Sequence, residues 1–237
     1  MTLPFSAVIL AGGAASRMGR TKAFLEVGGR EILERELDAT RECRDVILAT
    51  DEANPYAEAL HRYGWEADPA DRNTYYSSRV GHPEGRRARI LPDREPGLGP
   101  LAGLVGALEA AVEDRCWVLS CDLPFVTPEL GSALVTELGD PRSEDSRLAA
   151  VPTVEGRLQP LCAAYRRGAW RVGASLLEEG ERSMRALLKA IPVRQVPEER
   201  LQLPGDPRLL LLNVNTPEDL QTARALPQAD WSSGPDD

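Results

Sequence analysis

The chain has 237 residues, of which 42% are hydrophobic and 27% are charged, as in ordinary soluble globular proteins. Its formal net charge of -9 disfavours general binding to nucleic acid or to a membrane surface, because both favour broad basic patches. The N-terminus has no basic region before its short apolar run, so we expect neither a signal peptide nor a membrane span. Four separated cysteines without a C-x-x-C pair, and only two histidines, disfavour a zinc site and indicate reduced thiols in a cytoplasmic protein.

Short apolar runs alternate with helical patterns along the chain. We expect strands at residues 6–11, 45–50, 89–91, 116–122, 148–152 and 160–165, and in the run RLLLLNV at 208–214. We expect helices at residues 31–40, 54–63, 100–114, 169–179 and 183–190, and others beginning at Pro128 and Pro217. This alternation predicts an α/β fold: one Rossmann-like domain over residues 1–226, with three layers (α/β/α) and a mostly parallel sheet.

Two stretches interrupt this pattern. Residues 68–89 hold five arginines and two tyrosines with few aliphatic side chains. We expect a surface insertion there, or alternatively a mobile flap over an anionic ligand. Residues 227–237 are predicted to form a disordered tail.

The connection after the first strand is rich in glycine and positive charge. Gly12 and Gly13 let the backbone approach a ligand closely, and N–H groups at such a strand end suit phosphate oxygens. Arg17 and Lys22 would add full charges for a triphosphate. The spacing is neither G-x-G-x-x-G nor G-x-x-x-x-G-K-[ST], because Ala23 follows Lys22, and this excludes a P-loop NTPase.

Polar side chains also follow later strands. Asp122 closes the buried strand CWVLSCD, where a carboxylate would lie at the binding crevice, and we expect it to bind Mg²⁺ through hard oxygen atoms. Asp93 ends the short strand RILPD. Asn213 and Asn215 are two residues apart, which places both side chains on one side of an extended strand. The alternative for this segment is capping of the helix that begins at Pro217.

The motif LAGGAASRMGRTKAFLEVGG resembles the signature L-A-G-G-x-x-x-R-M-G-x-x-K-x-x-L-x-x-x-G of nucleotidyltransferases with a GT-A-type Rossmann-like domain. The segments LPDREPGLGPLAGLVGAL, LSCDLPFVTPEL and LNVNTPEDL follow in this order and extend the resemblance over nearly the whole chain. Together they are similar to the molybdenum cofactor guanylyltransferases, the MobA-like proteins.

The resemblance implies a role for each matching residue. Catalytic roles fall on Lys22, Arg17 and Asp122. Nucleotide contacts are implied for Leu10, Ala11, Gly12, Gly13, Lys22, Asp93 and Asp122, with Asp122 also holding Mg²⁺. Contacts to the second substrate are expected from Gln159, Arg182, Asn213 and Asn215, with Gln159 standing where many relatives have histidine.

The implied reaction is in-line displacement at the α-phosphorus of GTP by the phosphate of molybdopterin, with pyrophosphate leaving. Because a phosphate monoester oxygen is already deprotonated at neutral pH, the enzyme needs alignment and charge neutralisation rather than a general base. Transient contacts with cofactor-insertion proteins or molybdoenzymes are also expected. The alternatives are a molybdopterin cytidylyltransferase that uses CTP, a sugar- or polyol-phosphate nucleotidyltransferase, and a non-catalytic nucleotide-binding module.

Overall fold

The computed structural model describes residues 4–12, 21–79, 81–93, 97–144, 146–201, 203 and 206–226. Gly13, Arg17 and the tail at 227–237 lie outside these described residues. None of the described helices combines the length and apolar character that a bilayer crossing requires.

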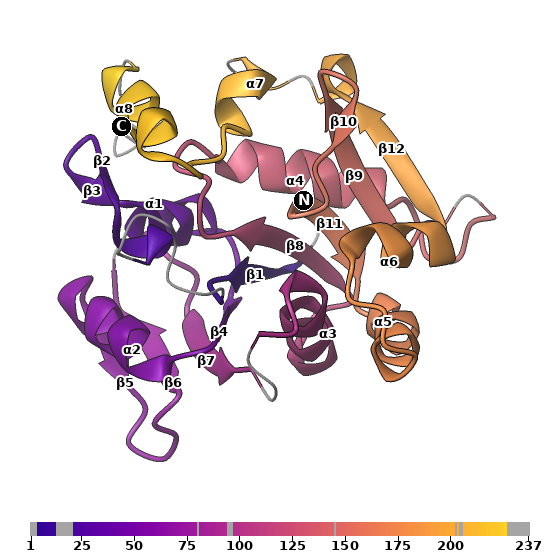
Figure 1. Ribbon diagram of the computed structural model, residues 1–237. Helices are drawn as coiled ribbons and strands as arrows, with labels where there is room; N and C mark the ends of the chain where they lie inside the picture. Colours follow the sequence, from indigo (N-terminus) through magenta and orange to yellow (C-terminus); the bar gives the residue numbers. More distant parts are fainter. Residues whose placement is uncertain are drawn as a thin grey trace.

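Strands and helices alternate along most of the chain (Figure 1). The strands are β1 (Ser6–Leu10), β2 (Glu26–Val27), β3 (Arg30–Glu31), β4 (Asp45–Thr50), β5 (Trp65–Ala67), β6 (Thr74–Ser77), β7 (Arg87–Pro92), β8 (Arg115–Ser120), β9 (Ala149–Val154), β10 (Arg157–Leu158), β11 (Cys162–Arg166) and β12 (Val193–Pro197). The helices are α1 (Ile32–Ala39), α2 (Ala53–Arg62), α3 (Pro100–Ala110), α4 (Pro128–Glu137), α5 (Ala169–Glu178), α6 (Met184–Ala190), α7 (Pro207–Leu210) and α8 (Pro217–Ala225). Two short 3₁₀ helices are η1 (Lys22–Phe24) and η2 (Glu198–Arg200).

One large sheet runs through the molecule in the order β10-β9-β11-β8-β1-β4-β7-β6-β5, with β12 paired to β9. The four central strands β8, β1, β4 and β7 are parallel, and both edges continue with antiparallel strands. The expected α/β fold with a parallel sheet at its centre is therefore confirmed. Leu10 pairs with Ala49 in β4 and with Ser120 in β8, so these strands end at one level.

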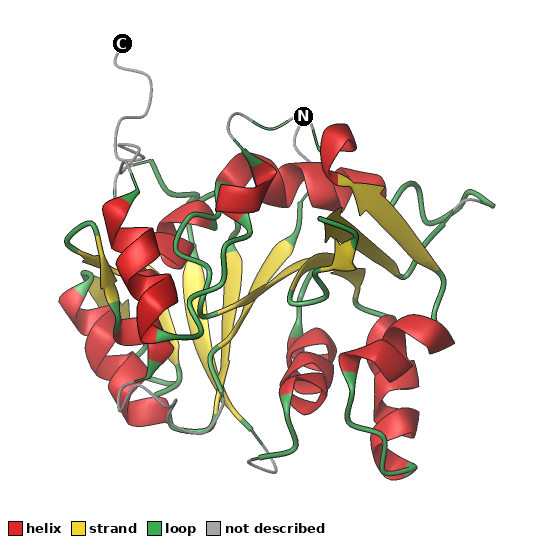
Figure 2. Cartoon of the chain, turned by 45° about the horizontal axis from the view of Figure 1, so that its top comes forward, coloured by secondary structure: helices red, strands yellow, loops and turns green. Residues whose placement is uncertain are grey.

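Helices cover both faces of the sheet (Figure 2). Along β1, Ala7 and Ile9 belong to the buried cluster that includes residues of α1, α2 and α4. Val8 and Leu10 belong to the cluster that includes residues of α3, α5 and α6. All five residues of β1 are buried, and after Ser6 they form a continuous apolar run, as expected for a central parallel strand.

The segment RLLLLNV is not the strand that its apolar run predicts. Residues 207–210 instead form α7, which begins where the Asp206 side chain accepts a 2.9 Å hydrogen bond from the Arg208 N–H. Pro207, at the first helical position, has its φ fixed near the helical value. A capped proline start thus overrides the strand preference of the leucine run.

Residues 68–89 do not form a detached insertion over their described part. This range contains β6 and the start of β7, and β6 pairs antiparallel with β7, with Tyr75 buried. Arg86 is fully buried and donates to the carbonyl oxygens of Leu37 at 2.7 Å and Cys43 at 3.1 Å. Burial lowers the pKa of Arg86 to about 10. Part of this arginine-rich segment therefore supplies internal hydrogen bonds and sheet pairing. For the segment as a whole, the surface insertion or flap stays a prediction.

Six short strands have no counterpart among the expected strands: β2, β3, β5, β6, β10 and β12. Two of them, β5 and β12, show why. Each carries a single buried side chain, Trp65 in β5 and Val196 in β12. Such short strands with little burial give almost no hydrophobic pattern.

Candidate active site

A pocket of about 480 Å³ opens where the central parallel strands end. Its lining includes the sequence-predicted residues Leu10, Ala11, Gly12, Lys22, Asp93, Asp122 and Asn215. Ligands of doubly wound sheets bind at such an edge, beyond the carboxyl ends of the strands. The structure therefore brings most of the described candidate residues together in one cavity.

Lys22, Asp122 and Asn215 meet at the floor of this pocket. The Lys22 Nζ donates to Asp122 Oδ2 at 3.0 Å and to Asn215 Oδ1 at 2.6 Å. The second carboxylate oxygen of Asp122 accepts a hydrogen bond from the Ser120 hydroxyl at 2.5 Å. Asp122 is thus held from both sides. Ser120 lies within the segment LSCDLPFVTPEL, but the sequence analysis assigned it no role.

The backbone explains why these three segments converge. The Cys121 N–H donates to the Leu10 carbonyl oxygen at 3.1 Å, which joins the end of β8 to the end of β1. The Val214 N–H donates to the Asp122 carbonyl oxygen at 2.9 Å, so the chain before α8 runs beside the aspartate. Main-chain hydrogen bonds therefore hold together, in one site, segments that are far apart in the sequence.

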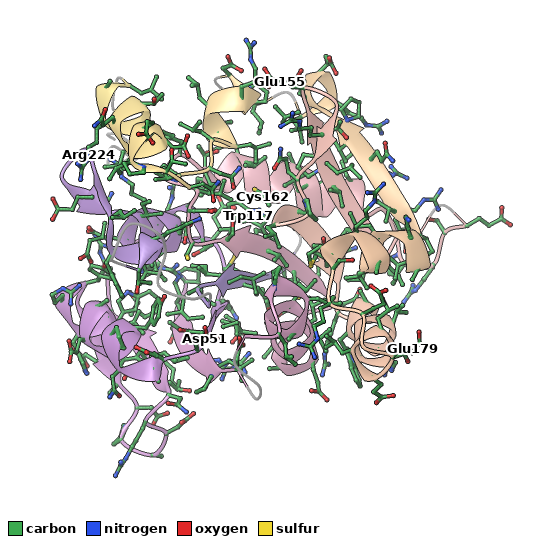
Figure 3. All side chains as sticks on the ribbon, in the orientation of Figure 1. Asp51, Trp117, Glu155, Cys162, Glu179 and Arg224 are labelled. Carbon is green, nitrogen blue, oxygen red and sulfur yellow. The ribbon has the colours of Figure 1, made fainter. Side chains whose placement is uncertain are left out.

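The helix α8 fixes Asn215 relative to Lys22. Val214 and Ala223 pack in a buried cluster with residues of the β2–β3 hairpin, which directly follows η1 and Lys22. Arg224 donates to the Glu26 carbonyl oxygen at 2.9 Å, and Figure 3 shows Arg224 beside this hairpin. The end of the chain thereby holds the segment that carries the lysine.

The two asparagines have different roles, contrary to the expectation that they act together. Asn213 Nδ2 donates to the Leu211 carbonyl oxygen at 3.0 Å and does not line the pocket. Asn215 reaches Lys22, while its own N–H donates to Asp219 Oδ2 at 2.9 Å. Thr216 completes a capping box with Asp219, so the segment caps α8 and also contributes to the site.

A pair of carboxyl groups lies at another side of the pocket. Asp51 follows β4 (labelled in Figure 3), Asp93 follows β7, and the Asp93 N–H donates to the Thr50 carbonyl oxygen at 2.8 Å. Burial, a hydrogen bond with Asp51 and the charge of Asp51 raise the pKa of Asp93 to about 6. Asp51 was not among the expected site residues, because an aspartate after a strand is also a common turn residue.

Gly12 is packed closely against this pair. A Cβ at position 12 would lie 3.1 Å from Asp51 Oδ1 and 3.2 Å from Asp93 Oδ2. Gly99, which precedes α3, has a φ of +81°, a left-handed conformation that glycine adopts readily. Both glycines line the pocket. Gly12 allows the backbone to lie close to the two carboxyl groups, and Gly99 allows the left-handed turn before α3.

Gln159 and Arg182 are outside the pocket lining. Gln159 lies in the turn before β11, two residues before pocket-lining Leu161, and its N–H donates to the Pro152 carbonyl oxygen at 2.9 Å. The carbonyl oxygen of Arg182 lies 4.0 Å from where a Cβ on Gly99 would be. These two candidate contacts to a second substrate thus lie outside the pocket lining but near Leu161 and Gly99, which belong to it.

A buried acid that no sequence pattern singled out lies close enough to Asp122 to feel its charge. Glu36, in α1, is fully buried, and neither of its carboxyl oxygens hydrogen bonds to a described residue with normal geometry. Its pKa is raised well above its usual range by burial and, secondly, by the charge of Asp122, while the Leu123 N–H opposes this rise. A glutamate on a helix normally reads as solvent-exposed, so only the fold reveals this position.

A lysine and an aspartate thus meet at the carboxyl edge of the parallel centre of the sheet. The MobA-like NTP transferase domain matches residues 7–196, and the chain belongs to this family.

Curated relatives extend the similarity over almost the whole chain. A probable molybdenum cofactor guanylyltransferase from Pelotomaculum thermopropionicum is 32% identical over 224 residues, which are 94% of this chain and 94% of the relative. Another, from Halalkalibacterium halodurans, is 31% identical over 90% of this chain and 94% of its own length.

Solved structures show the same fold. Molybdopterin-guanine dinucleotide biosynthesis protein A from Archaeoglobus fulgidus has a TM-score of 0.69 and 22% identity, covering 93% of this chain and 97% of its own. The 2-C-methyl-D-erythritol 4-phosphate cytidylyltransferase from Thermus thermophilus has a TM-score of 0.60 and 24% identity, with coverages of 94% and 98%. One fold thus serves enzymes with different nucleotides in their names.

Proposed function

We propose that the protein transfers GMP from GTP to the phosphate of molybdopterin and releases pyrophosphate. The observation that carries the proposal is the contact between Lys22 and Asp122 in a pocket at the carboxyl edge of the sheet. The pocket volume of about 480 Å³ lies within the range of small-molecule sites. The guanylyltransferase names of the relatives support GTP and molybdopterin as the substrates.

The oxygens at the floor of the pocket fit a divalent cation. The positive Lys22 Nζ already lies between Asp122 Oδ2 and Asn215 Oδ1. Mg²⁺ prefers such hard oxygens and is often bound by one or two carboxylates with substrate phosphates and waters. Among the described residues no group of three or more His, Cys, Asp or Glu side chains could hold a metal. In our proposal Asp122 is a single carboxylate anchor for Mg²⁺, and phosphate oxygens and waters complete the coordination. The bound ion would neutralise phosphate charge.

The side chains at this floor supply alignment and charge. Lys22 is 23% exposed at its side chain, so its ammonium can leave Asp122 and bind phosphate oxygens of the nucleotide. There it stabilises the negative charge that develops on departing pyrophosphate. Ser120 keeps the Asp122 carboxylate oriented through its hydroxyl. Arg17 and Gly13 remain proposed nucleotide contacts, and both lie outside the described residues.

The carboxyl pair of Asp51 and Asp93 favours guanine as the base. A carboxylate only accepts hydrogen bonds, and guanine offers adjacent N–H donors on its pairing edge. Cytosine offers only its amino group there. Both aspartates line the pocket together with Gly12. This is the feature of the pocket that supports GTP over CTP.

In this proposal the second substrate approaches from the side of the pocket near Gln159 and Arg182. Arg182 would attract the phosphate of molybdopterin through its positive charge, and Gln159 would contribute neutral hydrogen bonds. The attacking phosphate oxygen needs no proton removed at neutral pH. The chain therefore has to position it in line with the α-phosphorus. Such positioning can lower the activation free energy by roughly 7–11 kcal/mol.

Pyrophosphate release tests the proposal directly. The purified protein is incubated with Mg²⁺ and, in parallel, GTP, CTP or ATP, with either isolated molybdopterin or a sugar or polyol phosphate as the acceptor. We expect release with GTP that requires molybdopterin and stops when the metal is chelated. Faster release with CTP would instead identify a cytidylyltransferase. Release only with a sugar or polyol phosphate as acceptor would identify the other transferase class, and no release with any pair would leave a binding module.

A further inference from the structure

We propose that Tyr56 is a positioning residue, which fixes the peptide group between Ala11 and Gly12 so that the Gly12 N–H faces the nucleotide. The inference rests on the proposed function, because it assumes that a nucleotide binds in this pocket. Tyr56 itself is not part of the pocket lining and is only 2% exposed. It would therefore act through the backbone that it holds rather than through the ligand.

The first step is the hydrogen bond of the phenol. The Tyr56 hydroxyl donates to the Ala11 carbonyl oxygen at 2.7 Å, in a buried position. The Ala11 N–H donates to the Ala49 carbonyl oxygen, also at 2.7 Å. Ala11 is thus fixed through both its N–H and its C=O at the point where the nucleotide loop leaves β1.

The second step follows from peptide geometry. The described peptide bonds are trans, and in a trans peptide the C=O and the next N–H point in opposite directions. Because the Ala11 carbonyl points to Tyr56 in the core, the Gly12 N–H points away from it, and Gly12 lines the pocket. Among the described residues the Gly12 N–H makes no hydrogen bond, so it is available to an anionic or carbonyl group of a ligand.

The third step concerns the other end of the same loop. The Tyr56 ring lies 5.2 Å from the Phe24 ring, measured between centroids, at a 41° tilt. Phe24 belongs to η1, which begins with Lys22. One side chain from α2 therefore contacts both the residue that starts the nucleotide loop and the turn that carries its lysine.

A tyrosine that merely fills the core would affect stability without affecting nucleotide affinity, so the two roles can be separated. Tyr56→Phe removes the hydroxyl and keeps the ring contact with Phe24. Without the hydroxyl, the bound nucleotide has to hold the Ala11–Gly12 peptide group in place itself. The cost is about that of one hydrogen bond, which is about a five-fold change in affinity. We expect the Kd for MgGTP, measured by calorimetry, to rise about five-fold and kcat to change less than two-fold.

The matched control is Tyr63→Phe. Tyr63 lies at the end of the same helix, and its hydroxyl donates to the carboxylate of Glu31, away from the pocket lining. This variant also loses one tyrosine hydrogen bond, and we expect the Kd for MgGTP to stay at the wild-type value. Equal affinities of wild type and Tyr56→Phe, with only a lower Tm for the variant, would overturn the inference.

A second measurement does not depend on any variant. In ¹⁵N-labelled wild-type protein, the Gly12 amide resonance should shift on addition of MgGTP. An unmoved Gly12 resonance in a protein that binds MgGTP would overturn the positioning role and leave the proposed function intact. Wild-type protein that does not bind MgGTP would overturn both.

Discussion

The ammonium of Lys22 lies 3.0 Å from the carboxylate of Asp122, although 100 residues separate them along the chain. The pairing of Leu10 with Ser120 places the ends of β1 and β8 side by side. The hydrogen bond from Lys22 to Asn215 joins the lysine to the segment that runs beside Asp122. The Lys22 side chain is 23% exposed and that of Asp122 is 12% exposed, so the pair faces the pocket rather than the core. Such a partly exposed pair stabilises the fold only modestly, and its place in the pocket is the basis of the catalytic role that we propose for it.

Replacing Lys22 should lower the rate and leave the fold intact. We expect Lys22→Ala to reduce kcat for pyrophosphate release by about 10²–10³-fold, because a charge that stabilises the leaving group is lost. The measurement is pyrophosphate release at saturating MgGTP, with circular dichroism as the test of folding. The control is Lys189→Ala, since the chain's other lysine is exposed on α6. Similar rates for the two variants would contradict the leaving-group role.

Asp122→Asn tests the metal anchor. The amide keeps the size of the side chain but loses the negative charge, so we expect half-maximal activity to need at least about ten-fold more Mg²⁺. A titration of activity against Mg²⁺ measures this shift. Asp140→Asn serves as the control, because Asp140 is in the turn after α4 and is absent from the pocket lining. An unchanged Mg²⁺ requirement in Asp122→Asn would exclude Asp122 as the anchor.

The pKa of Asp93 should depend on Asp51. Asp51→Asn removes the neighbouring negative charge, so the pKa of Asp93 should fall below its value of about 6, as followed by carboxyl NMR. In the wild type the folded state keeps this proton above the ordinary pKa of 3.8, so the free energy of unfolding decreases as pH rises from there to about 6. That decrease should be smaller in Asp51→Asn. An unmoved pKa of Asp93 would show that burial alone raises it.

Glu36 should make the protein less stable as pH rises. Its raised pKa means that the folded state keeps a proton that the unfolded chain releases above about 4.5. The free energy of unfolding therefore falls as pH rises from that value toward the folded-state pKa. Glu36→Gln removes this linkage, so its Tm relative to wild type should increase between pH 4 and pH 8. A Tm difference that is constant with pH would show that Glu36 does not bind this proton.

Two helix glycines should respond oppositely to alanine. At Gly131 in α4, a Cβ would lie 2.4 Å from a ring carbon of Trp117, which is fully buried and labelled in Figure 3. We expect Gly131→Ala to lower the free energy of unfolding by about 1–3 kcal/mol through overpacking. At Gly106 in α3 the nearest atom would be 3.8 Å away, so Gly106→Ala should raise it by about 0.5–1 kcal/mol. Urea denaturation measures both, and a stabilised Gly131→Ala would show that Trp117 can move aside.

The amino-acid sequence by itself determined the order of most elements and the identity of Lys22 and Asp122 as candidate site residues. Hydrophobic periodicity is a local property, and glycine, lysine and aspartate at a strand end reveal their chemistry without knowledge of their neighbours. For this reason β4 has the predicted bounds, Asp45–Thr50. The family resemblance likewise depends on short motifs in a fixed order and not on contacts between them.

Only the tertiary structure decided which of these residues meet. It paired Asp51 with Asp93, separated Asn215 from Asn213, and buried Glu36 near Asp122. Strand pairing and the direction of a side chain depend on partners that are distant along the chain, so no local pattern can specify them. The contact of Lys22 with Asn215, across 193 residues, exists because α8 packs on the β2–β3 hairpin through long-range burial of apolar side chains.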